Sequence, residues 1–271
     1  MYARLLPVAL LSLTACGRSH DGDPRSLPVA RHFSWSESLA SDAVVYVRTM
    51  NGAVRVIEGT GSVALVKAEV RGHGSRARAV RFETHRVGND VVICAMWTEG
   101  GQCNARDYKT KLEMKMSFFG RRGSTPRADF TIELPAGTRV DAVAMNGDVV
   151  VDAVRSPVEA RTVNGDVRIG TAVGPVRART VNGDVQVRVA SLGTTGGVEL
   201  ETVNGDVEAE LPAALDGDLR LKTVNGALEV GYPVQVGPGS RKRIAATVGK
   251  GGRPIVMETV NGDVTLRKLG G

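Results

Sequence analysis

Aspartates that recur behind an Asn-Gly pair are the first candidates for chemistry in this chain. Stacked carboxylates can coordinate Ca²⁺, which takes about six to eight oxygen ligands. The chain lacks the Gly-Gly-x-Gly-x-Asp nonapeptide of calcium-binding repeats, and Ala53 and Ala227 replace the aspartate in two copies. The alternative is an aspartate that hydrogen-bonds the turn backbone. We favour this second interpretation and expect no metal and no cofactor. The column in question comprises Asp148, Asp166, Asp184, Asp206 and Asp263.

The N-terminal residues have the composition of an export signal. Arg4 supplies a positive charge, and the apolar run 5–13 is too short to remain as a membrane-spanning helix. The sequence Leu-Thr-Ala-Cys-Gly at 13–17 then resembles the bacterial lipobox. This resemblance implies cleavage before Cys16 and attachment of lipid to it. The alternative is an ordinary secretory signal with a chance cysteine.

These features predict a lipoprotein signal peptide at 1–15 and a lipidated flexible tether at 16–40, since the segment after Cys16 is polar with Gly and Pro. Gly17, in place of an aspartate, follows the cysteine. The lipobox resemblance therefore implies the outer membrane of a Gram-negative envelope, with the periplasmic or surface face left open.

Two further cysteines, Cys94 and Cys103, remain in the mature chain. Exported proteins fold in an oxidising compartment, so we expect a disulfide that closes the loop 95–102. A metal or redox pair is the alternative. It needs closer spacing or histidine partners, and the histidines are scattered along the sequence, at His20, His32, His73 and His85.

The composition excludes several functions. The formal charge is +6 and aromatic residues make up 4% of the chain, so there is no stacking platform for single-stranded nucleic acid. A modest positive charge is compatible with acidic envelope polysaccharide or lipid. No Gly-x-Ser-x-Gly, His-Glu-x-x-His or phosphate-binding glycine loop is present. We therefore expect no enzymatic activity, with an envelope glycan-active enzyme as the alternative.

The elements that must position any site come from a repeat, Thr-Val-Asn-Gly-Asp-Val or a close variant. The copies at Asn146, Asn164 and Asn182 follow each other at 18 residues and the next two at 22 and 21, whereas the last follows after 36. The pairs at its centre are predicted repeat turns: Asn51-Gly52, Asn146-Gly147, Asn164-Gly165, Asn182-Gly183, Asn204-Gly205, Asn225-Gly226 and Asn261-Gly262.

Period-2 alternation on both sides of each Asn-Gly predicts half-buried strands. Asn-Gly alone favours an antiparallel meander or sandwich of type I′ hairpins. Two observations favour a β-solenoid of stacked coils of 18–22 residues. The identity extends beyond Asn-Gly, as Thr and Asn ladders require. Outward charges also alternate between copies, as in the column Glu159, Arg177, Glu199, Arg220.

We divide the solenoid into an irregular β part at 41–140 and a regular part at 141–271. The irregular part is expected to cap one end and the charged tail Arg267-Lys268 the other. A basic loop with two phenylalanines, at 118–126, is a further candidate contact surface.

The lipobox, the copy at Asn51, the phrase FTIELPAG at 130–137 and the later Asn-Gly-Asp copies occur in a specific order. Over about 44–266 this order resembles a bacterial β-strand-repeat family of unknown function whose members are called "putative adhesins". The resemblance implies a non-enzymatic binding or structural role in the cell envelope. Expected partners are the membrane, through the lipid, and an envelope protein or polysaccharide, but no nucleic acid. A Ca²⁺-stabilised module remains a second alternative.

Overall fold

The computed structural model describes residues 28–73, 80–97, 101–109, 125–193, 196–234 and 241–270. Cys16, the predicted signal peptide and most of the 118–126 loop lie outside these residues. Within the described ranges the chain is built from strands, and no helix there is long and apolar enough to cross a membrane.

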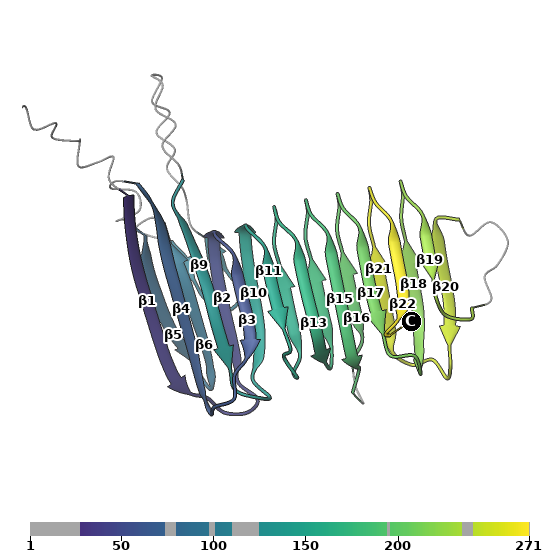
Figure 1. The fold of residues 1–271 in the computed structure, drawn as a ribbon, viewed down its shortest axis with the longest axis horizontal. Coiled ribbons are helices and arrows are strands. Elements are labelled where there is room, and N and C mark those ends of the chain that lie inside the picture. The colour runs from purple at the N-terminus through teal and green to yellow at the C-terminus, as the bar shows by residue number, and fades with distance from the viewer. Residues whose placement is uncertain are drawn as a thin grey trace, which may run out of the picture.

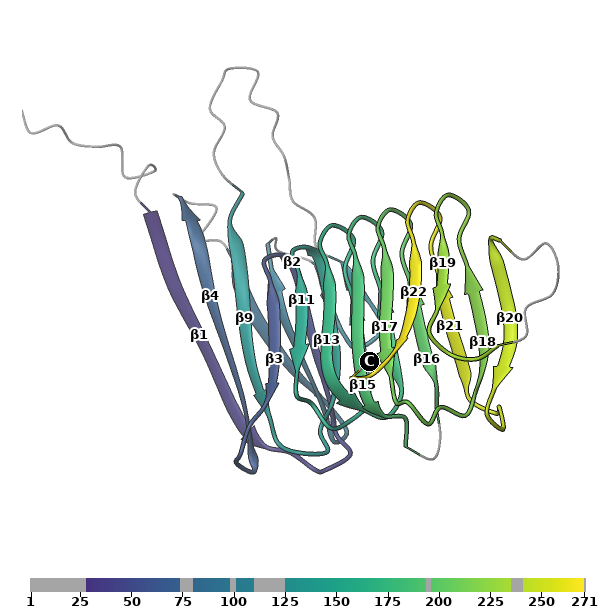
Figure 2. The ribbon, with the colours of Figure 1, turned by 45° about the vertical axis from the view of Figure 1, so that its right-hand side comes forward.

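Two ten-stranded sheets face each other across one core (Figure 1, Figure 2). Sheet A contains, in spatial order, β1 (Pro28–Ser38), β4 (Val63–His73), β9 (Arg127–Leu134), β3 (Val54–Glu58), β11 (Val149–Asp152), β13 (Val167–Val173), β15 (Val185–Ser191), β17 (Val207–Leu211), β22 (Val264–Lys268) and β19 (Leu228–Val230).

Sheet B contains, from the opposite end of the stack, β20 (Arg243–Val248), β18 (Gly217–Lys222), β21 (Pro254–Glu258), β16 (Val198–Glu201), β14 (Val176–Arg179), β12 (Val158–Arg161), β10 (Arg139–Asn146), β2 (Val44–Asn51), β6 (Asp90–Met96) and β5 (Arg81–Val87). A small separate hairpin joins β7 (Gln102–Cys103) and β8 (Tyr108–Lys109).

The repeats are parallel coils, each with one strand in sheet B, a corner, and one strand in sheet A. Equivalent residues stack directly, so Val158 lies beside Val176 and Val176 beside Val198. The alternating Val, Ala, Leu and Ile side chains point inward and are almost fully buried. The β-solenoid prediction is therefore confirmed, and the hairpin alternative is wrong for the repeats.

The Asn-Gly pair forms the corner between the two sheets and not a type I′ hairpin. A type I′ turn needs positive φ at both residues, but Ala153 is the one non-glycine with positive φ in the described chain. The glycine is required for another reason. At Gly183, φ is 148°, and a Cβ would lie 2.0 Å from the carbonyl oxygen of Gly165 in the preceding coil. Glycine here permits close stacking.

The spatial order of the coils departs from the sequence order at both ends. The last coil in sequence, β21/β22, lies between β16/β17 and β18/β19. Likewise β2/β3 lies between β6/β9 and β10/β11. The charge column expected from sequence is corrected accordingly, because Val256 separates Glu199 from Arg220.

Antiparallel strands close the described ends. β1 and β4 extend sheet A, and β5 extends sheet B, so the irregular part does cap one end. Part of the segment predicted as a tether at 16–40 is a strand instead, because residues 28–38 form β1. β1 alternates polar and aromatic residues and pairs antiparallel with β4. The prediction for Arg267-Lys268 is wrong: β22 is internal, and β20 and β19 form the other end.

Candidate functional site

The repeat motif is occupied by scaffold contacts. From Asn146 onward, each motif Asn donates from Nδ2 to Oδ1 of the Asn in the spatially preceding coil, at 2.7–2.8 Å. From Thr162 onward, each motif Thr hydroxyl donates to a glycine carbonyl of that coil, as Thr180 does to Gly165 at 2.9 Å. The Asn ladder is confirmed, whereas the Thr side chains bond to backbone and not to one another.

The aspartates also bond between coils. Oδ1 of each accepts the amide hydrogen of the next position in the column, as Asp166 does from Asp184 at 2.9 Å. In spatial order Ala53 precedes the five aspartates and Ala227 follows them, so the column is continuous. The expected backbone hydrogen bond is present, but it reaches the neighbouring coil. One oxygen of each carboxylate is thereby used.

The second residue of the motif has a different environment. It follows the buried threonine, so alternation turns its side chain outward. One side chain per coil is therefore 37–51% exposed and forms a continuous apolar row along one corner of the solenoid. At about 4.8 Å per coil the row is roughly 24 Å long. We call it the valine ridge; its members are Met145, Val163, Val181, Val203, Val260 and Val224.

A groove of about 560 Å³ lies between this ridge and the outer face of sheet B. The ridge and the threonines form one side. Arginines and one glutamate, from the outward positions of β12, β14 and β16, form the other side. The β7–β8 hairpin, which follows the disulfide, contributes two residues at one end. The lining residues used below are Arg106, Tyr108, Arg161, Arg179 and Glu201.

The Cys94–Cys103 disulfide is formed as predicted. It holds the β7–β8 hairpin over the outer face of sheet B, above Val92 and Met96. Met50, the residue equivalent to the ridge valines in coil β2/β3, is only 8% exposed, compared with 38% for Met145 in the next coil. The exposed ridge therefore begins at Met145, one coil beyond the coil that the hairpin contacts through Tyr46 and Arg48.

Arg48 attaches the β7–β8 hairpin to sheet B. Its guanidinium is almost fully buried and donates to Asp141 Oδ1 at 2.9 Å and to the Asp141 carbonyl at 2.7 Å. Its Nη2 donates to the carbonyl of Ala105, in the turn between β7 and β8, at 2.8 Å. Arg161 also contacts Asp141, at 3.3 Å. The end of the groove is thus held by a buried, charge-assisted network.

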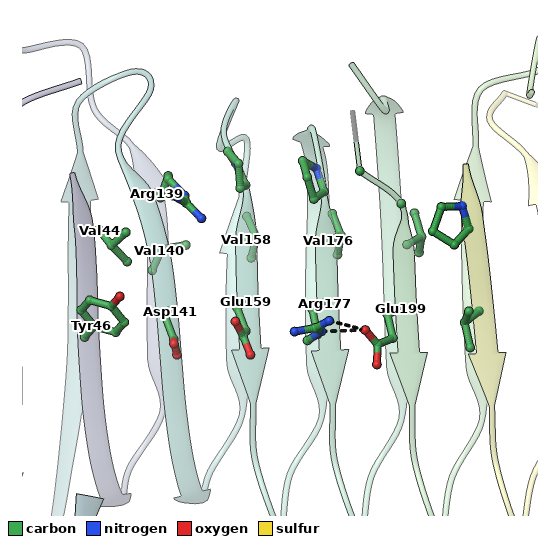
Figure 3. A pocket seen from close by; sticks show the side chains of 17 residues that line it. Val44, Tyr46, Arg139, Val140, Asp141, Val158, Glu159, Val176, Arg177 and Glu199 are labelled. Atoms are coloured by element: carbon green, nitrogen blue, oxygen red, sulfur yellow. Dashed lines mark hydrogen bonds and ion pairs between the residues drawn. The ribbon is translucent and has the colours of Figure 1, made fainter. Parts of the chain in front are cut away.

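A second hollow of about 410 Å³ lies on the same face, nearer the proline-lined edge of the coils (Figure 3). Its carboxylates point outward from neighbouring strands. Arg177 Nη2 lies 2.6 Å from Glu199 Oε2, and Arg179 forms a further ion pair with Glu199. Partial burial raises the pKa of Glu199, but hydrogen bonds from these two arginines outweigh it and leave the pKa below its ordinary value. Glu199 is thus held ionised and paired.

Glu201 differs from Glu199. Burial, with repulsion from Glu199 and Glu258, outweighs the attraction of Arg179 and raises the pKa of Glu201. A glycosidase needs such an acid beside a second, available carboxylate. Of the two acidic neighbours of Glu201, Glu199 is already bonded to two arginines, and Glu258 lies 3.7 Å from the Lys222 ammonium. This face therefore offers ionic and apolar contacts more readily than acid–base chemistry.

The ridge is not among the surfaces expected from the sequence, where the loop at 118–126 is the candidate contact surface. The available signal was the alternation itself. If Thr162 and Val167 face inward, Val163 must face outward.

Comparison with known proteins gives a family and distant structural similarities. The family model of Toastrack DUF4097 matches residues 98–267. No curated protein matches the chain. A "putative cell adhesion protein" from Clostridium sporogenes ATCC 15579 is 10% identical, with a TM-score of 0.46 over 90% of this chain and 100% of that one. A "putative adhesin" from Bacteroides fragilis NCTC 9343 is 9% identical, with a TM-score of 0.29 over 88% and 97%. A "putative lipid binding protein" from Parabacteroides distasonis ATCC 8503 is 8% identical, with a TM-score of 0.27 over 89% and 96%.

Proposed function

The chain belongs to the Toastrack DUF4097 family, and from this premise we propose that it is a lipid-anchored envelope protein with a non-enzymatic, adhesin-like binding role. The observation that carries the binding role is the valine ridge with its adjoining groove. An exposed apolar row rimmed by polar residues is typical of a docking surface.

The chemistry of the groove favours a polypeptide over a polysaccharide. Sugar recognition needs unengaged hydrogen-bonding groups and aromatic platforms. Here the threonine hydroxyls already donate to glycine carbonyls, and Tyr108 is the single aromatic residue of the lining. The ridge offers methyl groups instead.

Two features indicate what kind of polypeptide fits. The β7–β8 hairpin already covers the face of the first copy, so an extended segment of a partner can continue this coverage along the ridge. Four arginines and one glutamate line the groove, and Arg48 is buried in its pair with Asp141. The other three, Arg106, Arg161 and Arg179, are at least partly exposed. We therefore propose an extended partner segment with apolar side chains toward the ridge and acidic side chains toward the arginines.

Site-specific photo-crosslinking tests this proposal in the producing cell. A photoreactive residue at Val181 should give one dominant envelope-protein adduct, and the same residue at Val87, which is 51% exposed on β5, should not. Val181→Asp should abolish capture and Val87→Asp should leave it intact. Crosslinking to polysaccharide at Val181, or equal adducts from both positions, would refute a polypeptide partner.

Anchoring is proposed from the lipobox resemblance at Cys16 and from Gly17, which favours the outer membrane. Wild-type protein should incorporate labelled fatty acid and fractionate with the outer membrane. Cys16→Ser should lose the label and become soluble in the envelope. Unchanged membrane fractionation of Cys16→Ser would contradict anchoring without affecting the groove, since the two tests are independent.

A further inference from the structure

A group of metal-ligand side chains surrounds the disulfide on the outer face of sheet B. Ligand atoms of Glu83, His85 and Cys103 all lie within 4.8 Å of one another. His85 Nε2 is 3.4 Å from Glu83 Oε2. A tetrahedral Zn²⁺ with bonds of about 2.0–2.3 Å separates its ligand atoms by roughly 3.3–3.8 Å, so this spacing needs little adjustment.

The strands explain why these residues converge. Glu83 and His85 are two apart on β5 and share one face. Glu83 is the direct cross-strand partner of Cys94 in the antiparallel pair β5–β6. The disulfide brings Cys103 onto the same spot. The distance of the histidines along the sequence argued against a metal, and the β5–β6 hairpin removes that objection for His85.

While the disulfide is intact, neither sulfur can act as a thiolate ligand. We propose that Glu83, His85 and Cys103, with the released thiolate of Cys94 as the fourth ligand, form a Zn²⁺ site when the disulfide is reduced. The site would then have two states, one cross-linked by a disulfide and one by a metal ion. Both cross-links lie at the base of the β7–β8 hairpin, which ends the groove.

Reduction requires an external dithiol of the thioredoxin class. Its thiolate attacks the Cys103 sulfur, which is the more exposed of the two since Cys94 is fully buried. The Cys94 thiolate leaves, and the second thiol of the reductant displaces Cys103 and closes the reductant's own disulfide. Both cysteines then carry thiol or thiolate. Zn²⁺ binding releases their remaining protons and uses the neutral imidazole of His85 and the carboxylate of Glu83.

The test uses the full chain carrying Cys16→Ser, which removes the third thiol. Zn²⁺ affinity is measured by competition with a chromophoric chelator, and Co²⁺ is used as a spectroscopic probe for thiolate coordination. The reduced chain should bind at least about 100-fold more tightly than the oxidised chain. His85→Ala should weaken binding at least tenfold, since even outer-shell changes cost about 10–100-fold. His32→Ala, which removes an exposed histidine on β1, should have no effect.

A second variant separates the site from any unfolding caused by reduction. Cys94→Ala leaves the Cys103 thiol free with no reductant present, and it should give a thiolate-to-Co²⁺ absorption band that Cys103→Ala lacks, with both variants folded by circular dichroism. Equal Zn²⁺ affinity of oxidised and reduced chains, wild-type affinity of His85→Ala, or absence of the band in folded Cys94→Ala would each overturn the proposal.

Discussion

Gly183→Ala should be among the most destabilising single substitutions in the chain, although it adds one methyl group at a corner. The added Cβ would lie 2.0 Å from the Gly165 carbonyl oxygen. An ordinary carbon–oxygen contact is about 3.3 Å, so the two coils must separate locally by about 1.3 Å. The preceding coil cannot yield by rotating a side chain, because the atom it presents is backbone.

The magnitude follows from the bonds that cross this gap. Six hydrogen bonds of 2.8–2.9 Å join the two corners. Four are Asn182 N to the Val163 carbonyl, Gly165 N to the Asn182 carbonyl, Asn182 Nδ2 to Asn164 Oδ1, and Asp184 N to Asp166 Oδ1. The other two are Thr180 Oγ1 to the Gly165 carbonyl and Val167 N to the Asp184 carbonyl. At about 1 kcal/mol each, their loss costs about 6 kcal/mol. Strain at φ 148° adds about 1 kcal/mol, for a total of about 7 kcal/mol.

Gly88→Ala is the matched control, because Gly88 has φ 63° and a Cβ there meets nothing within 4 Å. It should cost only the backbone strain, about 1–2 kcal/mol. Urea unfolding followed by tryptophan fluorescence and circular dichroism gives both values, from midpoint shifts at constant m. If Gly183→Ala costs no more than Gly88→Ala, coil stacking does not explain the glycine.

The other predictions concern the ridge, the buried network, the aspartates and acid stability. Val181→Thr should change unfolding free energy by less than about 0.5 kcal/mol while weakening partner capture, measured with the crosslinking target. Asp141→Ala should cost about 3–5 kcal/mol in urea unfolding, because it leaves Arg48 buried without its partner. Calcium or a chelator should leave Tm unchanged, because the aspartates bond to amides. The pKa of Glu199 is lower in the folded state than in the unfolded state. Its contribution to folding stability is therefore fully present above the unfolded-state pKa and is lost as the pH falls through the folded-state pKa. Glu199→Gln should therefore reduce the loss of stability as the pH falls below the ordinary glutamate pKa.

The sequence was sufficient to predict the coil, the inward face and the Asn ladder, because these depend on local alternation and on like residues stacking. It was not sufficient for the coil order. Charges favoured the wrong order: sequence order places Glu201 beside Lys222, whereas the structure places Glu258 between them. Ala227, which has no carboxylate to accept an amide hydrogen from a following coil, occupies the last position in the column. Ala53 has none either and is followed by Asp148, so the missing carboxylate alone did not determine the coil order.

The site was harder to predict, for a related reason. In a repeat of near-identical coils, the residues that bond one coil to the next recur as a motif and resemble a functional signature. The exposed valines recur within the same motif, so the sequence alone does not distinguish them from the structural residues. The β7–β8 hairpin lies in the part of the chain without regular repeats, so no repeat pattern predicts its position. Glu83 and His85 lie beside the disulfide because β5 pairs with β6. Sequence distance carries no information about such pairing.

The exposed valines are the feature that the scaffold does not explain. The corner requires Thr for its bond to glycine, Asn for its ladder, Gly for close approach and Asp for the next amide. The remaining position faces outward and makes no demand for an apolar side chain; threonine has the same branched shape and would remain hydrated. Apolar residues nevertheless fill it in six successive coils. Exposing them gives nothing to folding, whereas burial against a partner contributes about 25 cal/mol per Å² of apolar area. The proposed function, in which a partner covers the ridge, therefore accounts for this residue.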